Sequence, residues 1–187
     1  MNASDMTFLN VWQAHTQQRL FRRLLDAFAY PGRLLDAADS GTNARLAILA
    51  TLLDAEVSLA DPHELVTHED WIRLMAAAAA PGQARFVVAD AARAPDFTPA
   101  LGSLESPEFG ATLVLEVQQL GAGTPLLLTG PGIASQTRLA VQGLHPAWMA
   151  QRADWVSAYP LGVDIILCDA THFAALPRTT QIIREAL

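Results

Sequence analysis

Three polar residues near the C-terminus, Arg178, Thr179 and Thr180, have side chains that could bind an anion. The guanidinium group offers a planar fork of N–H donors, and the two hydroxyl groups add donors for a tetrahedral oxyanion. Asp164 lies in an apolar, β-branched run, and a carboxylate there needs a partner because burying an unpaired charge is costly. Arg178 is a suitable partner. Two alternatives stay open: a structural ion pair at the sheet edge, or an anion site in which Asp164 orients Arg178.

Two further segments contain residues that could contact a ligand. Gly130 and Gly132 flank a proline, and glycines let a backbone approach a ligand closely, but the spacing is not that of a phosphate-binding loop. A turn that ends a strand is the favoured interpretation. Glu108 precedes a predicted strand and could act as an acid, a base or a metal ligand. A turn that sets the strand register, or a dimer contact, is the favoured alternative for Glu108.

Two clusters of reactive residue types are weaker candidates. His63 and His68 are five residues apart and would diverge on a helix, so we expect no metal site. Cys168 precedes His172 by four residues, but it ends an apolar strand and is expected to be a buried, small hydrophobic residue. The sequence contains no recognisable set of catalytic residues, and the catalytic residues are therefore unassigned.

The chain contains no lysine, and all 12 of its basic residues are arginine. This composition excludes the lysine of a pyridoxal phosphate (PLP) Schiff base, of a P-loop and of a kinase. A single cysteine cannot hold an iron–sulfur cluster. We therefore expect no cofactor, and any cation that binds a ligand must be an arginine, a histidine or a bound metal.

Length and composition predict one folded domain spanning residues 1–187. A hydrophobic fraction of 51% with 17% charged residues is typical of a compact protein with a full core. The net charge of −7 disfavours binding to nucleic acid or to an anionic membrane. The N-terminus has no basic region before an apolar stretch, and the single cysteine suits a reducing compartment, so we expect a cytoplasmic protein.

Hydrophobic periodicity predicts an α/β fold with a mixed, helix-covered β-sheet. The segments 111–117 and 126–129 are expected to pair as a hairpin. Along the helix at 16–28, Leu20, Phe21, Leu24, Leu25 and Phe28 are expected to face inward. The other predicted helices are 42–54, 67–80 and 146–158, and the other predicted strands are 33–35, 57–59, 85–89, 138–141 and 163–167.

Five segments of the chain, taken in order, resemble the PhnH family of subunits of the carbon–phosphorus lyase system for phosphonate use. The resemblance implies an α/β fold similar to that of the PLP-dependent transferases, but without the cofactor. It also implies a homodimer and a core complex with PhnG, PhnI and PhnJ. The segments are Phe21–Leu25 with Pro31–Gly32, Pro107–Thr112, Leu128–Ile133, Pro160–Asp164 and Leu176–Thr180.

The resemblance further implies a role in forming alpha-D-ribose 1-methylphosphonate 5-triphosphate from ATP and methylphosphonate, together with PhnG, PhnI and PhnL. Cleavage of the carbon–phosphorus bond belongs to PhnJ in that system. The subunit would then be structural or would position a ligand, and the anion near Arg178 would be a phosphate or phosphonate. Two alternatives are a stand-alone transferase or hydrolase acting on a phosphorylated sugar, and a scaffold without any ligand site.

Overall fold

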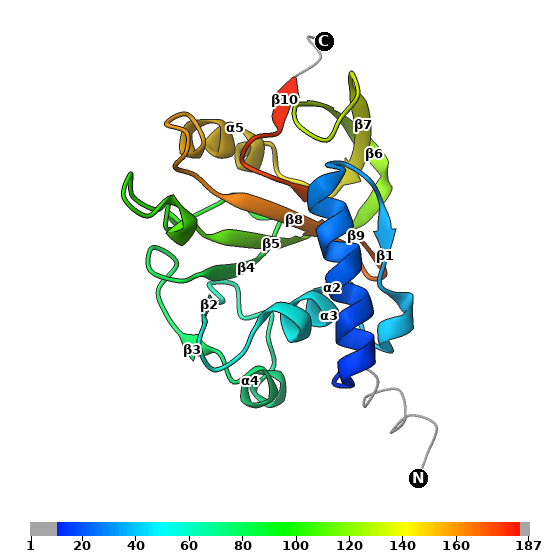
Figure 1. The fold of residues 1–187 in the computed structure, drawn as a ribbon, viewed down its shortest axis with the longest axis vertical. Helices are drawn as coiled ribbons and strands as arrows, with labels where there is room; N and C mark the ends of the chain where they lie inside the picture. The colour runs from blue at the N-terminus through cyan, green and yellow to red at the C-terminus, as the bar shows by residue number, and fades with distance from the viewer. Residues whose placement is uncertain (1–10, 184–187) are drawn as a thin grey trace.

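The computed structural model describes residues 11–183, which contain a seven-stranded sheet and a three-stranded sheet (Figure 1). The larger sheet has the order β1-β9-β8-β5-β4-β2-β3, and its strands are mixed in direction, as predicted. The strands of this sheet are β1 (Leu35–Asp36), β2 (Ser58–Ala60), β3 (Ala77–Ala78), β4 (Phe86–Asp90), β5 (Thr112–Glu116), β8 (Asp164–Cys168) and β9 (His172–Leu176). The helices are α2 (Ala14–Ala29), α3 (Ala44–Leu52), α4 (His68–Leu74) and α5 (Pro146–Trp155), with 3₁₀ turns at Ala38–Ser40 and Pro107–Phe109.

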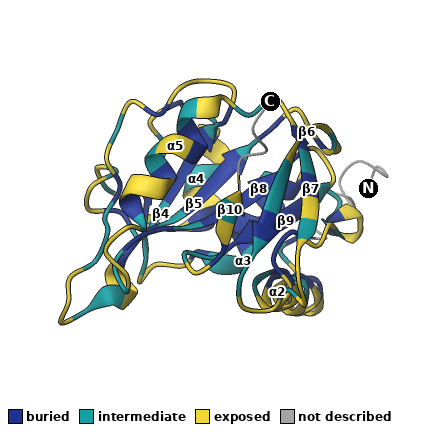
Figure 2. Ribbon diagram, turned by 90° about the horizontal axis from the view of Figure 1, so that it is seen from above, coloured by how far each residue is buried: buried dark blue, intermediate teal, exposed yellow. Residues whose placement is uncertain are grey.

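The central strands β5 and β8 are buried on both faces, which explains their continuous apolar sequences (Figure 2). Successive side chains of a strand point to opposite faces, so Val114 packs toward α2 and α3, whereas Leu113 and Leu115 pack toward α5. Trp148 of α5 is fully buried on the latter face. None of the helices in residues 11–183 has the length and apolar character needed to cross a membrane.

The smaller sheet is antiparallel and has the order β10-β6-β7, with β6 at Gln119–Thr129, β7 at Thr137–Gln142 and β10 at Gln181–Ile183. The predicted hairpin between 111–117 and 126–129 is therefore wrong. Strands β4 and β8 already occupy both edges of β5 as parallel neighbours, so no edge is left for a returning strand. The chain instead leaves the large sheet after β5 and pairs with β7.

The predicted helix at 67–80 is too long. Thr67 caps this helix, because its hydroxyl oxygen accepts a hydrogen bond from the amide of Asp70 at 3.1 Å. The helix ends at Leu74, where Met75 adopts a left-handed conformation with φ of 57°. The following alanines form β3, whose backbone pairs with β2. Tertiary pairing thus overrides the helix propensity of alanine.

The inward face of α2 is only partly as predicted. Leu20 and Leu24 are buried, but Phe21 and Leu25 are 46% and 54% exposed. The buried stripe continues instead through Thr16 and Ala27, because α2 packs against α3 and β9 with one narrow side. Strands β9 and β10 are additional elements that the periodicity of the sequence does not reveal.

Asp169 connects the two sheets. It lies in the turn between β8 and β9, and its Oδ2 accepts a hydrogen bond from the amide of Leu120 in β6 at 2.9 Å. Its Oδ1 accepts hydrogen bonds from the amides of Thr171 and His172 at 2.8 and 2.7 Å. Burial by itself would raise the pKa of Asp169, but these three N–H donors and the His172 ring hold that pKa below its usual value.

Replacing Asp169 with asparagine is expected to lower the free energy of unfolding by about 2 kcal/mol at pH 7, because three hydrogen bonds to a charged acceptor are weakened. A carboxylate with a depressed folded pKa contributes stability that is fully present above its unfolded pKa of about 3.9 and is lost as the pH falls through the folded value. Urea unfolding of both proteins at pH 7 and at stepwise lower pH should show the difference shrinking in acid. A difference that stays constant over that range contradicts this assignment.

Candidate functional site

Asp164 and Arg178 form an ion pair where β8 begins and β9 ends. These two strands are antiparallel neighbours, so the residues that flank them at this edge lie side by side. Nη2 of Arg178 is 2.8 Å from Oδ2 of Asp164, and Nε donates to both carboxylate oxygens at 3.3 and 3.4 Å. The backbone amide of Arg178 donates to Oδ1 at 2.7 Å. The side chains are 15% and 22% exposed, so the pair is largely withdrawn from water.

The guanidinium group of Arg178 also holds two loops. Its Nη1 donates to the carbonyl oxygens of Pro107 and Pro160 at 2.9 and 3.1 Å. An arginine side chain has five N–H donors, and four of those of Arg178 form hydrogen bonds within the protein. These four are the Nε hydrogen, both hydrogens of Nη1 and one hydrogen of Nη2. This geometry supports the structural alternative for the ion pair. Anion binding by Arg178 stays a prediction, and one donor remains for it.

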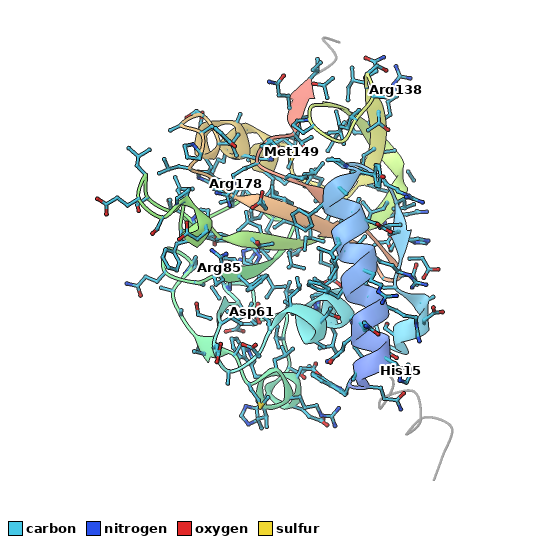
Figure 3. All side chains as sticks on the ribbon, viewed as in Figure 1. His15, Asp61, Arg85, Arg138, Met149 and Arg178 are labelled. Carbon is cyan, nitrogen blue, oxygen red and sulfur yellow. The ribbon has the colours of Figure 1, made fainter. Side chains whose placement is uncertain are left out.

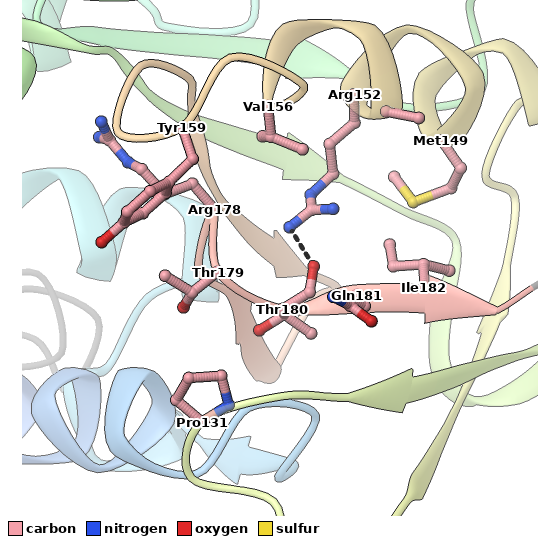
Figure 4. Close-up of a pocket in the computed structure, with 11 residues that line it drawn as sticks. Pro131, Met149, Arg152, Val156, Tyr159, Arg178, Thr179, Thr180, Gln181 and Ile182 are labelled. Atoms are coloured by element: carbon pink, nitrogen blue, oxygen red, sulfur yellow. Dashed lines mark hydrogen bonds between the residues drawn. The ribbon is translucent and has the colours of Figure 1, made fainter. Parts of the chain in front are cut away.

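A pocket of about 660 Å³ lies between α5 and the segment that joins β9 to β10 (Figure 4). Its volume is in the range typical of small-molecule sites. It is at the edge where the parallel strands begin, whereas ligands of open α/β sheets usually bind at the opposite edge. It is lined by Met149, Arg152, Ala153 and Val156 on one side, by Arg178, Thr179, Thr180, Gln181 and Ile182 on the other, and by Pro131 and Tyr159.

Arg152 is the residue of this pocket that the sequence analysis missed. It is only 3% exposed, and its Nη2 donates to the carbonyl oxygens of Pro177 and Thr180 at 2.6 and 2.9 Å. Burial lowers the pKa of Arg152 to about 10, an effect that the charge of Asp164 partly offsets, so the side chain is cationic at neutral pH. The signal was present in the helical period, because residue 152 falls on the same stripe as the inward-facing Met149 and Trp155.

The pocket and the ion pair belong to a chain that matches a known family along nearly all of its length. The family model of the bacterial phosphonate metabolism protein (PhnH) covers residues 10–183. The chain belongs to the PhnH family. The family resemblance inferred from five sequence segments is thereby confirmed.

Two curated relatives of this PhnH-family chain cover most of its length. It is 47% identical over 172 residues to the putative C-P lyase subunit protein HtxG of Stutzerimonas stutzeri, covering 92% of this chain and 88% of the relative. It is 35% identical over 185 residues to the alpha-D-ribose 1-methylphosphonate 5-triphosphate synthase subunit PhnH of Rhizobium meliloti (strain 1021), covering 90% of each chain.

Four predicted site residues of the PhnH-family chain lie together. Arg178, Thr179 and Thr180 line the pocket, and Asp164 supports it through the ion pair. Gly130 lies against the same segment, since a Cβ atom built on it would be 3.0 Å from the carbonyl oxygen of Thr179. The structure thus brings Asp164 and the segment from Arg178 to Thr180 together, and anion binding by these residues stays a prediction.

The other two predicted residues lie outside the pocket of this PhnH-family chain. Gly132 faces the end of α2, where a Cβ atom would be 2.1 Å from the carbonyl oxygen of Ala29, so the turn that ends β6 explains this glycine. Glu108 is exposed on a 3₁₀ turn, and the neighbouring Pro107 contacts the site through its carbonyl oxygen, which accepts a hydrogen bond from Arg178. A ligand role for either residue stays a prediction.

The structure explains individual residues of the two weaker clusters in this PhnH-family chain. His63 is buried, and its Nδ1 accepts a hydrogen bond from the amide of Asp90 at 3.0 Å, whereas His68 begins α4. Cys168 is fully buried in β8, and burial raises the pKa of its thiol, which disfavours the thiolate that a nucleophile needs. The prediction that Cys168 is a small hydrophobic residue is confirmed.

A second pocket, of about 690 Å³, lies along the same sheet edge, and Arg85 is one of its lining residues. Arg85 is labelled in Figure 3. Arg85 donates to the carbonyl oxygen of Gly110 at 3.3 Å, and its own amide donates to the Ser58 hydroxyl. Within residues 11–183, no buried side chain of this second pocket lacks a hydrogen-bond partner. The first pocket therefore has the stronger features of a ligand site.

Proposed function

We propose that this chain is a subunit of a carbon–phosphorus lyase system in phosphonate catabolism. The observation that carries the proposal is the similarity along almost the whole chain to a relative named as a C-P lyase subunit, at 47% identity. The second relative, named as a subunit of alpha-D-ribose 1-methylphosphonate 5-triphosphate synthase, supports a contribution to making that compound from ATP and methylphosphonate. The chain then acts in the cytoplasm with PhnG, PhnI and PhnJ as partners.

The role within that assembly is structural and ligand-positioning. The ion pair of Asp164 and Arg178 stabilises the loops at one sheet edge. Thr179 and Thr180 line the adjoining pocket, where they bind a phosphate or phosphonate. The isolated chain is a homodimer. Its fold is similar to that of the PLP-dependent transferases, and the lack of any lysine is the reason to propose a subunit that works without this cofactor.

Co-expression with PhnG, PhnI and PhnJ of the same source organism tests the proposal. We expect the tagged chain to retain all three partners through affinity purification and size exclusion, and to elute as a dimer when it is expressed alone. It should also restore growth on methylphosphonate as the sole phosphorus source to a host that lacks its own PhnH, while growth on inorganic phosphate is the control.

Failure to bind the partners by a folded, monodisperse protein contradicts the subunit role. Turnover of ribose 5-phosphate by the purified chain alone would favour instead the stand-alone transferase or hydrolase that the sequence left as an alternative. Among residues 11–183 no group of three or more His, Cys, Asp or Glu side chains could hold a metal ion, and burial raises the pKa of the Cys168 thiol, which disfavours it as a nucleophile.

A further inference from the structure

The buried guanidinium group of Arg152 has donors that the protein does not use. Nη2 is occupied by the two carbonyl oxygens, but Nε is buried without a hydrogen-bond partner. Within the described part of the chain, Nη1 has no hydrogen bond either, and it points toward the side of the pocket where Met149 lies (Figure 4). A buried donor without an acceptor is unfavourable, so an acceptor atom of a ligand on this side of the guanidinium would satisfy it.

The charge of Arg152 is also unmatched. Among the residues described, no carboxylate lies within ion-pair distance of it, and Asp164, whose charge acts on it from further away, is already paired with Arg178. Taking a cation out of water without a counter-ion is costly, and proteins tolerate it chiefly where an anion completes the site. Arg152 thus presents an uncompensated positive charge to a pocket of small-molecule size.

Thr180 adds a second unused group on the opposite wall. Thr180 is 2% exposed, and its Oγ1 has no hydrogen-bond partner, although its carbonyl oxygen accepts a hydrogen bond from Arg152. A hydroxyl group turns between staggered rotamers and can donate to an oxyanion in the pocket. The two unsatisfied groups, one cationic and one neutral, come from elements on facing sides of the same cavity (Figure 4).

We propose that Arg152 and Thr180 bind the phosphate or phosphonate group of a small organic molecule in this pocket, and that Arg178 positions the wall rather than the ligand. The inference deepens the ligand-positioning part of the proposed function and rests on it. Apolar side chains of Met149, Val156 and Ile182 surround the charged centre and suit the organic part of such a ligand. Tyr159, which is 69% exposed, offers its ring beside the opening.

Isothermal titration of the full chain with inorganic phosphate, methylphosphonate and ribose 5-phosphate tests the site. We expect ribose 5-phosphate to bind more tightly than inorganic phosphate, because the apolar wall adds contacts to the shared anion. Arg152→Gln should weaken binding of the tightest probe at least 10-fold. Arg73→Gln is the matched control, since it removes the same charge from the surface of α4, and it should leave the affinity unchanged.

Thr180→Val separates ligand binding from folding. Valine keeps the shape of threonine and removes an unpaired buried hydroxyl, so the melting temperature of the free protein should rise by about 2–4 °C. The same substitution should weaken binding several-fold and reduce the increase in melting temperature that the probe causes. If Thr180 had only a structural role, the Thr180→Val variant would not show both a higher melting temperature and weaker binding of the probe.

Equal affinities of the wild type and Arg152→Gln for every probe would overturn the assignment of Arg152. Absence of binding of all three probes at millimolar concentration would overturn the site itself. Either result leaves the subunit role to be decided by the partner purification, which does not depend on this pocket. Phosphate binding that equals ribose 5-phosphate binding and survives Arg152→Gln would show an adventitious ion only.

Discussion

Replacing Asp164 with alanine is expected to lower the free energy of unfolding by about 3 kcal/mol, because it leaves the guanidinium group of Arg178 largely buried and without its counter-charge. The carboxylate also accepts the backbone amide of Arg178, so the turn after β9 loses a second anchor. The freed side chain would no longer be held in line with the carbonyls of Pro107 and Pro160, and both loops should become more mobile. Denaturant unfolding measures the loss.

Glu69→Ala provides the matched control. Glu69 pairs with Arg73 at 2.7 Å, much the same distance as in the buried pair, but their side chains are 73% and 39% exposed. Because water screens an exposed pair, this substitution should cost about 0.5 kcal/mol or less. Similar losses for the two substitutions would show that Asp164 and Arg178 do not hold this edge together.

Gly110→Ala is expected to destabilise the protein by about 3 kcal/mol or more, for a purely steric reason. The φ angle of Gly110 is −61°, which any residue adopts, so backbone strain is not involved. A Cβ atom at this position would be 2.2 Å from the carbonyl oxygen of Gly162 and 3.0 Å from Nη1 of Arg178. The added methyl group would have no room, because backbone lies on one side of it and a guanidinium group held by four hydrogen bonds lies on the other.

Gly82→Ala tests the steric explanation. Gly82 also has no positive φ, but the nearest contact of a Cβ atom there is an ordinary 3.4 Å, so alanine should change stability little. Thermal unfolding of both variants, with hydrogen exchange of the loops at 107–110 and 160–162, distinguishes a local clash from a general effect. A Gly110→Ala protein as stable as Gly82→Ala would contradict the close packing described for this edge.

Local patterns predicted much of the fold. The residue types along the chain predicted the starts of α3 and α4, the strands β4, β5 and β8, and the pairing of Asp164 with Arg178. The predictions failed where long-range pairing decides the outcome. The alanines after Met75 form a strand only because β2 provides an edge for them, and the neighbours of β5 determine that β6 must pair elsewhere.

The candidate site was predictable from sequence only in part. Arg178, Thr179 and Thr180 attract attention because they are polar and adjacent, and they do line the pocket. Arg152 lies on α5, the helix that faces them. It becomes a candidate site residue only because the pairing of β10 with β6 places residues 177–180 opposite α5. Because that crossing is a property of the tertiary fold, residue types alone do not reveal an arginine with unused donors.

Strand β10 also determines the order in which the pocket can assemble. Strands β6 and β7 follow one another in the chain. The third strand of their sheet, β10, comes only after β8 and β9, which belong to the larger sheet. The contact between β10 and β6 therefore closes a long loop, and such contacts form late because the entropy of loop closure must be offset first. The segment between β9 and β10 is one wall of the pocket, so ligand binding in a refolding experiment should recover together with the slowest rise in native signal.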